Sequence, residues 1–180
     1  MSRAEAGAPD TVADVGRDEA IAVLFRAHCA DLIRLGYALT GDRGAAEEAT
    51  QDAFISLYRH WNSVRDHSAS RAYLRAAVVN RCRSVHRRRA RTIRAVEPLR
   101  PDLVSSPGAD SDALAHEASH RIASQVRILP QRQREVIVCR YYLDLTERET
   151  ADLLDVTVGS VKKHASRAIA KLHDQLEVSP

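Results

Sequence analysis

Residues 145–172 have the sequence LTERETADLLDVTVGSVKKHASRAIAKL, and this stretch decides the fold class of the C-terminal part of the chain. Thr146 is followed three residues later by Glu149, which fits a capping box at the start of a helix. In a capping box the side chain of each of these two residues accepts a hydrogen bond from the backbone N–H of the other. Residues 155–157 separate that short helix from a longer one, which is expected to end at about Leu176. Two helices joined by about three residues predict a helix-turn-helix.

The longer helix of this pair has two faces of different chemistry. Small and apolar side chains recur at helical spacing on the face expected to pack inward, namely Val161, Ala165, Ala168 and Leu172. The opposite face carries a hydroxyl and three cations, namely Ser160, Lys163, Arg167 and Lys171. Such a helix suits the major groove of duplex DNA, where bases and phosphates accept hydrogen bonds. The alternative is a solvated basic face, against which the capping box and the short turn argue.

Upstream of this pair, the chain contains a further helical region and a segment with the composition of a linker. Residues 95–109 hold three prolines, one glycine and two adjacent serines, which indicates a linker. Pro130 stands where a new helix is expected to begin, because proline suits the first helical position. The apolar side of that helix is expected to comprise Val136, Ile137, Tyr141 and Tyr142.

The N-terminal half predicts three more helices, because apolar residues recur there at spacings of three and four. They are expected at about residues 18–39, from Asp42 to about Trp61, and at 70–91, with Asp42 as the N-cap of the second. The whole chain is therefore expected to be all-α, with two small helical domains joined by a flexible linker. Its expected parts are a tail at 1–17, a first domain at 18–94, a linker at 95–111 and a second domain at 112–177.

Positive charge is concentrated at the end of the third expected helix. Residues 71–100 contain ten arginines and a single acid, Glu97, and such a cluster repels itself unless a polyanion is near. The planar guanidinium of arginine suits phosphates and base edges. Trp61 and Tyr73 lie beside an intervening polar loop and are able to stack on unpaired bases, although ordinary core positions explain them equally well.

Composition narrows the class of protein. The 180 residues are 44% hydrophobic and 28% charged, with a formal net charge of +3, a mixture typical of soluble globular proteins. Neither a membrane span, which needs roughly 20 apolar residues, nor a secretory signal is expected from the pattern. The three cysteines are odd in number and more than fifty residues apart, a pattern that predicts neither a disulfide framework nor a metal-ligand pair. We therefore expect a cytoplasmic protein without a metal or cofactor.

Three segments together resemble the extracytoplasmic-function (ECF) group of bacterial sigma factors, the smallest members of the sigma-70 family. Residues 47–58 resemble its acidic-Gln-acidic-Phe helix, and residues 73–88 resemble its promoter-melting helix. The segment from Leu129 to Lys171 resembles its C-terminal helix-turn-helix. Each segment alone is moderately specific, whereas all three in this order and spacing are highly specific, and the likeness extends over about residues 18–176.

The resemblance implies a transcription initiation factor without enzymatic activity, which binds core RNA polymerase and directs it to promoters. It implies sigma domains 2 and 4, with domain 4 on the β-flap tip of the polymerase and one face of the second helix on the β′ clamp helices. That face comprises Glu48, Gln51, Asp52 and Ile55. Recognition of the −35 element is implied for Ser160, Lys162, Lys163, Arg167 and Lys171.

Domain 2 is implied to capture an unpaired base of the −10 element and to hold the opened strand. The residues implied for capture and melting are Trp61, Asn62, Arg65, Tyr73, Asn80, Arg83, Arg87 and Arg88. An anti-sigma factor is a further partner that the resemblance admits. The chain departs from the family pattern at Ala72 and Ser84, and also in the turn of the helix-turn-helix, where Asp155 and Thr157 replace the usual Gly and Pro.

Two other interpretations are open at this point. The motif His116-Glu117-Ala118-Ser119-His120 matches that of zinc metalloproteases, but only Glu135 is an obvious candidate for a third ligand. The second interpretation is a helix-turn-helix regulator that binds duplex DNA without polymerase. A separate hypothesis concerns Cys82, which lies among arginines that favour a thiolate and hence a lowered thiol pKa.

Overall fold

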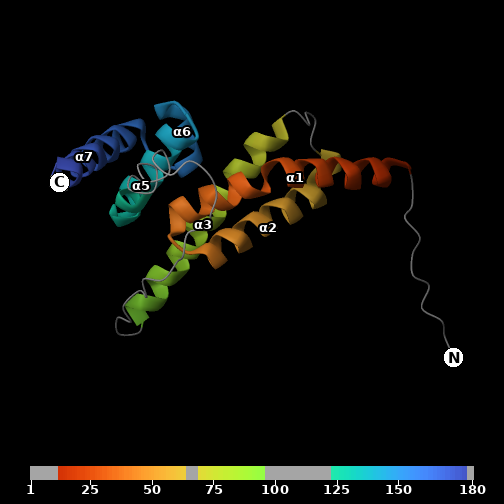
Figure 1. The fold of residues 1–180 in the computed structure, drawn as a ribbon, viewed down its shortest axis with the longest axis horizontal. Coiled ribbons are helices and arrows are strands. Elements are labelled where there is room, and N and C mark those ends of the chain that lie inside the picture. The colour runs from red at the N-terminus through yellow and green to blue at the C-terminus, as the bar shows by residue number, and fades with distance from the viewer. Residues whose placement is uncertain (1–11, 64–68, 96–122, 178–180) are drawn as a thin grey trace.

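The computed structural model describes residues 12–63, 69–95 and 123–177, and every regular element in these ranges is helical (Figure 1). The first unit consists of α1 (Val12–Thr40), α2 (Arg43–His60), the 3₁₀ turn η1 (Trp61–Ser63) and α3 (Ser70–Ala95). The second unit begins with a helical turn at residues 123–128 and continues with α5 (Gln131–Ile137), the π-helical segment η3 (Val138–Tyr142), α6 (Glu147–Leu154) and α7 (Val158–Glu177). The all-α prediction is therefore confirmed for the described residues.

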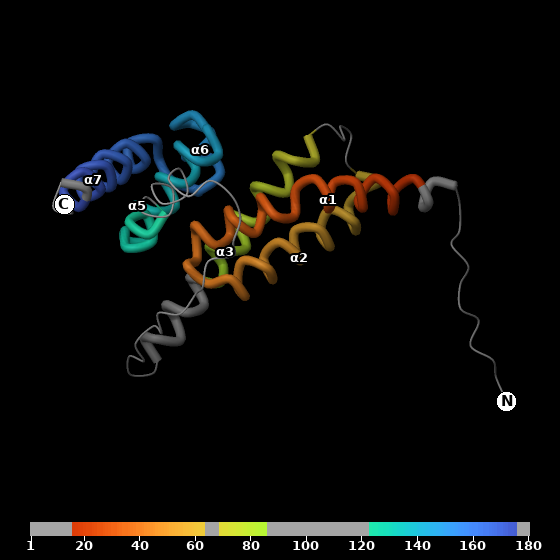
Figure 2. The backbone as a smooth tube through the Cα atoms, viewed as in Figure 1, coloured from red at the N-terminus to blue at the C-terminus, as the bar shows by residue number. Residues whose placement is uncertain are grey.

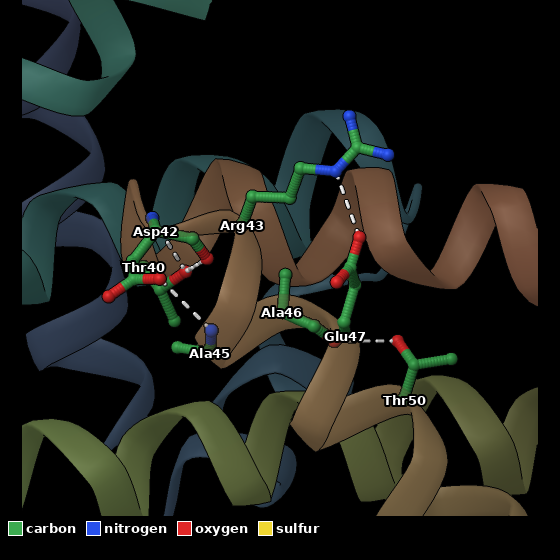
Figure 3. A network of polar contacts seen from close by, with 7 residues as sticks. All are labelled: Thr40, Asp42, Arg43, Ala45, Ala46, Glu47 and Thr50. Atoms are coloured by element: carbon green, nitrogen blue, oxygen red, sulfur yellow. Dashed lines mark hydrogen bonds and ion pairs between the residues drawn. The ribbon is translucent and has the colours of Figure 1, made fainter. Parts of the chain in front are cut away.

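The chain turns sharply between α1 and α2 at Thr40-Gly41-Asp42, as expected (Figure 3). The hydroxyl of Thr40 donates to the carbonyl of Gly36 at 2.8 Å and closes the last turn of α1. Gly41 follows with φ +70°, a left-handed conformation that glycine adopts without steric cost. The carboxylate of Asp42 then accepts from the backbone N–H of Ala45 at 3.0 Å, so Asp42 is the N-cap of α2.

Helices α1 and α2 cross at close range because a glycine lies at the crossing. A Cβ added at Gly36 would lie 2.9 Å from the Cβ and 3.0 Å from the Cα of Ala46, which is closer than ordinary van der Waals contact. Ala46 is itself completely buried. The two helices therefore approach along a pair of small residues, and this crossing sets the direction in which the outer face of α2 points.

A single apolar core connects the two units, which lie beside each other in Figure 2. Its large buried side chains include Leu35, Leu39, Leu57, Leu74 and Val78 in the first unit and Val136, Leu154 and Val161 in the second. A unit of about 60 residues buries only about 60% of the surface that its unfolded chain exposes, so a shared core adds stability. The sequence left open whether the two units pack together, and in the structure they do.

The structure differs from the expected helix boundaries at two places, and it does not describe two of the expected segments. α1 begins at Val12 and so includes residues 12–17, which were expected to form part of the tail. Trp61 belongs to η1 rather than to the last turn of α2, and its side chain is only partly buried. The expected linker at 95–111, apart from Ala95, lies outside the described residues, and so does the motif from His116 to His120.

The expectation that Tyr141 and Tyr142 lie on an apolar face is wrong. Their side chains are 61% and 48% exposed, whereas Val136 and Ile137 are buried as expected. The cause is the π-helical segment η3, in which the N–H of Leu143 bonds a carbonyl five residues earlier at 3.0 Å. The extra residue in this turn rotates the tyrosines away from the core.

Substituting Gly36 by alanine is expected to destabilise the protein by about 1–3 kcal/mol, because the backbone of Ala46 would have to move. The matched control is Gly16→Ala in the same helix, where nothing lies within 4 Å of an added Cβ. That control is expected to be neutral or stabilising by up to about 1 kcal/mol through helix propensity. Urea unfolding followed by circular dichroism measures both, and equal effects of the two substitutions would contradict the close crossing.

Candidate functional site

The outer face of α2 brings together two acids, an amide and an aliphatic side chain. Glu48, Gln51 and Ile55 are exposed and Asp52 is partly exposed, because the opposite face of α2 is buried. Asp52 forms an ion pair with Arg81 of α3. The structure thus places all four residues expected to bind polymerase on one accessible face, which combines negative charge with apolar surface.

An apolar groove lies one helical turn from Ile55, and the sequence analysis did not identify it. It is lined by Asp18, Ile21, Ala22, Phe25 and Arg26 of α1 and by Tyr58 of α2. Phe25 and Tyr58 are 48% and 39% exposed. Arg17 donates to the hydroxyl of Tyr58 at 2.7 Å, and its guanidinium carbon lies 4.2 Å from the centroid of that ring. The only signal in the sequence was a pair of large apolar residues, Val23 and Phe25, that fall off the buried stripe of α1.

The aromatic side chains expected to bind an unpaired base lie at one end of the first unit. Trp61 directly follows α2, and the hydroxyl of Tyr73 in α3 lies 2.7 Å from that of Ser56 in α2. Both rings are partly buried against the core, whereas Asn62 and Asn80 are exposed. Arg65 and the side chains of Arg87 and Arg88 lie outside the part of the chain that the structure describes.

Arg83 differs from Asn80, the other described residue expected to hold the opened strand, because its side chain points into the protein. Arg83 is only 7% exposed. Its guanidinium donates to the carbonyl of Leu153 at 3.2 Å and also to that of Leu154. These carbonyls end α6, where the helix dipole places partial negative charge and favours a cation. In this arrangement Arg83 contacts α6 of the second unit and is not available to a nucleic acid.

Helix α7 separates its apolar and cationic faces as expected. Val161 and Ala168 are completely buried, and Ala165 and Leu172 are partly buried. Lys163, Arg167 and Lys171 are all exposed. Because they follow one another at intervals of four residues, they form a row along the helix. The row gives α7 a positive surface suited to a groove of duplex DNA.

Two residues expected to read the −35 element have contacts within the second unit. The backbone N–H of Ser160 donates to the hydroxyl oxygen of Thr157 at 3.2 Å, and the two hydroxyl oxygens lie 2.9 Å apart. Thr157 thereby caps the start of α7. The ammonium of Lys162 lies 3.5 Å from a carboxylate oxygen of Glu147 in α6. Lys162 is therefore not part of the cationic row.

The turn between α6 and α7 accommodates the departures noted in the sequence. Asp155 adopts φ +50°, a left-handed conformation that Asp tolerates better than most residues, so it serves where glycine is usual. Thr146 and Glu149 form the expected capping box at the start of α6. Hydrogen bonds from the hydroxyl and the backbone N–H of Thr146 lower the pKa of the Glu149 carboxyl, since both stabilise its charged form.

The hypothesis of a reactive thiol at Cys82 is wrong for this structure. Cys82 is 1% exposed, and burial raises the pKa of its thiol to about 12. Burial also raises the pKa of the Cys139 thiol to about 12. Desolvation of the thiolate is the largest cause at both positions, so both side chains act as small apolar residues.

Neither a metal site nor a membrane span is found in the described residues. Within the ranges 12–63, 69–95 and 123–177, no three potential ligands among His, Cys, Asp and Glu gather to hold a metal ion. Glu135, the candidate third ligand for the motif at 116–120, is buried and accepts from Gln131 and Arg132 at 2.7 and 3.0 Å. None of the helices described combines the length and the apolar character required to cross a bilayer.

Two family models match the two units of the chain. Residues 24–92 match "Sigma-70 region 2", and residues 119–172 match "Sigma-70, region 4". The chain is 32% identical over 149 residues to the ECF RNA polymerase sigma factor SigM of Mycobacterium tuberculosis, covering 83% of this chain and 73% of SigM. It is 27% identical over 146 residues to the RNA polymerase sigma-E factor of Streptomyces avermitilis, covering 81% and 79%.

Two solved structures of protein complexes contain a chain of similar fold. One is RpoE of Bartonella quintana in complex with the anti-sigma factor NepR, with a TM-score of 0.68 and 21% identity, covering 94% of this chain and 100% of that chain. Another is CnrH in complex with the cytosolic domain of CnrY, with a TM-score of 0.60 and 22% identity, covering 93% and 94%. At these identities the likeness concerns the fold alone.

Substituting Thr146 by alanine is expected to destabilise the protein by about 1 kcal/mol, because the capping box loses a member at the start of α6. The control is Ser166→Ala, an exposed position on α7. Since the folded-state pKa of Glu149 is lowered, the contribution of its charge is present above the unfolded pKa and is lost as pH falls through the lowered value. Urea unfolding at neutral and acidic pH measures this, and an equal loss from Thr146→Ala at both would contradict the role of the carboxylate.

Proposed function

The chain belongs to the ECF sigma factors of the sigma-70 family, which direct RNA polymerase to promoters, and on that premise we propose how its surfaces divide the work. Its partners are core RNA polymerase and promoter DNA. In the proposed division, the first unit binds the polymerase and the −10 element, and the second unit reads the −35 element. The proposed domains are residues 18–94 and 112–177, joined by a linker at 95–111.

The exposed cationic row of α7 is the observation that carries the proposal for the −35 element. Lys163, Arg167 and Lys171 face solvent along one side of a helix whose other side is buried. A helix packed in this way presents its polar side to the major groove, as the second helix of a helix-turn-helix does. Ser160 lies at the N-terminal end of the same face, where side chains approach base edges, and Lys162 would have to leave Glu147 to take part.

The outer face of α2 supports the proposal for polymerase binding. Glu48, Gln51, Asp52 and Ile55 offer acids around an aliphatic centre, and the groove of Phe25 and Tyr58 extends the apolar area. Buried apolar contacts surrounded by charge complementarity are the usual anatomy of a protein interface. We propose that the β′ clamp helices of the polymerase bind this face and that the β-flap tip binds the second unit.

The end of the first unit supports the proposal for the −10 element. Trp61 and Tyr73 are held by packing and hydrogen bonding. Asn62, which directly follows Trp61, and Asn80, about two helical turns after Tyr73, are exposed. Aromatic faces and amide groups together accept a base that has left the stack. Arg65, Arg83, Arg87 and Arg88 would add phosphate contacts.

The proposed role needs no catalytic residue. Binding free energy would favour the opened promoter, and the polymerase would perform the chemistry of transcription. We propose accordingly that the protein is not an enzyme and that it acts in the cytoplasm with the polymerase. We also propose that an anti-sigma factor regulates it, as a partner of the kind bound to RpoE in the similar structure.

Run-off transcription with core polymerase tests the function and the role of α7 together. The wild-type protein is expected to start transcripts at promoters that core polymerase alone does not use. Lys163→Ala and Arg167→Ala are each expected to weaken promoter binding by about 1–3 kcal/mol, because each would lose a base or phosphate contact. Arg34→Ala on α1, another exposed arginine, is the matched control, and equal activity of all four proteins would contradict the assignment.

The polymerase-binding face is tested by reversing one of its charges. Glu48→Lys is expected to weaken the affinity for core polymerase at least tenfold, because it places a cation in an acidic interface. Glu47→Lys makes the same change about 100° round the helix, where the carboxylate already pairs with Arg43 at 2.8 Å. Titration of labelled protein with core polymerase measures both, and a larger loss from Glu47→Lys would exclude the proposed face.

A further inference from the structure

The two units are joined by polar contacts as well as by the shared core. Arg83 of α3 donates to the last carbonyls of α6, those of Leu153 and Leu154. A second contact joins Arg127 of the second unit to Tyr37 of α1, whose hydroxyl accepts from Nη1 at 2.9 Å. The guanidinium carbon of Arg127 also lies 5.2 Å from the centroid of the Tyr37 ring. Both contacts bridge residues that are far apart in the sequence.

Because Arg83 is buried, its charge needs a partner inside the protein. An arginine is almost never fully buried unless its charge is paired, because desolvation is costly. Here the carbonyls at the negative end of the α6 dipole supply the partner. Arg83 of the first unit thus binds the negatively polarised C-terminal end of α6 in the second unit.

This closed arrangement is too compact to contact both promoter elements at once. Arg83 touches α6, and α6 packs on α7, so the residue proposed for the −10 strand lies within a few helix diameters of the recognition helix. Packed helix axes are about 8–10 Å apart. The −35 and −10 elements are separated by roughly 25 base pairs, or roughly 85 Å of duplex. The units therefore have to separate before both elements are bound.

The chain between the units is long enough for that separation. A fully extended chain advances about 3.3–3.6 Å per residue, so residues 96–122 span up to roughly 90 Å.

We propose that the closed structure is a resting state in which Arg83 serves as a latch, and that opening transfers its guanidinium from the α6 carbonyls to the promoter strand. The proposal rests on the −10 role given to Arg83 in the proposed function. Lys163 and Arg167 remain exposed in the closed state, so closure withholds the strand-holding residue and leaves the −35 face accessible. One arginine would thus stabilise either the closed protein or the open promoter complex, but not both.

Small-angle X-ray scattering of the free, full-length protein tests the latch. Wild type is expected to match the closed structure. Arg83→Ala is expected to raise the open-to-closed ratio more than tenfold, because it removes two charge-assisted hydrogen bonds. Arg127→Ala, and the milder Tyr37→Phe, are each expected to raise it about two- to tenfold. Arg26→Ala, an exposed arginine away from the interface, is the control and is expected to scatter like wild type.

Circular dichroism of the same samples shows whether each variant is folded. If the alanine variants are unstable, Tyr37→Phe replaces them in the test, because it removes the hydroxyl and keeps the aromatic ring. Wild-type scattering from separated units, or unchanged scattering of Arg83→Ala and Arg127→Ala, would overturn the latch. These outcomes do not depend on transcription. If the wild-type protein with core polymerase starts no new transcripts, the proposed function fails whatever the scattering shows.

The proposed contact of Arg83 with the promoter strand predicts different behaviour for Arg83→Ala and Arg127→Ala. If only the open form binds core polymerase, the free energy of opening reduces the apparent affinity of the wild-type protein. Arg83→Ala and Arg127→Ala favour the open form, so both are expected to bind core polymerase several-fold more tightly than wild type. On a promoter found by run-off transcription, permanganate reactivity of unpaired thymines is expected to fall at least tenfold with Arg83→Ala and to be retained with Arg127→Ala. Equal opening by both variants would leave Arg83 without a promoter role and refute the transfer.

Discussion

Each helix in the described part of the chain buries one stripe of side chains, and this constraint fixes the placement of nearly all charged groups. Because Ala46 and Leu57 face inward on α2, Glu48 and Ile55 face outward. Val161 has the same effect on α7, where it directs Lys163 and Arg167 to solvent. The surfaces proposed to bind polymerase and DNA are thus consequences of core packing, and the closeness of α1 and α2 at Gly36 keeps that packing in register.

Two buried charged residues, Glu135 and Arg83, are exceptions to this rule, and Arg83 is the one that contacts the other unit. A cation in a basic helix is ordinarily expected to face solvent or a polyanion, yet it is buried against the carbonyl end of α6. The exception is physically reasonable because a helix C-terminus is one of the few uncharged groups that stabilises a buried cation. It also connects two surfaces with different proposed roles, so the position of the second unit and the availability of a strand-holding residue depend on one contact.

Family membership resolves the alternatives that the sequence left open. A regulator acting without polymerase has no need of a sigma-70 region 2, which residues 24–92 match in addition to the helix-turn-helix region. The zinc-protease interpretation required a third ligand, and its candidate Glu135 is instead engaged by Gln131 and Arg132 in α5. The partial burial of Trp61 and Tyr73 reconciles two interpretations of these aromatics, since a ring packed on one side still offers its edge or other face.

The sequence by itself determined the helices, their caps and the two-sided character of α2 and α7. These properties depend on neighbours within one or two turns, as Asp42, Thr146 and the intervals of the α7 cations illustrate. Only the tertiary structure decided that the units close on each other, that Arg83 and Cys82 are buried, and that Tyr141 and Tyr142 are exposed. The closing of the units and the burial of Arg83 and Cys82 depend on contacts between residues about seventy positions apart. The exposure of the two tyrosines depends on a π-helical turn. Long-range contacts and a single π-helical turn leave no periodic signal in the sequence.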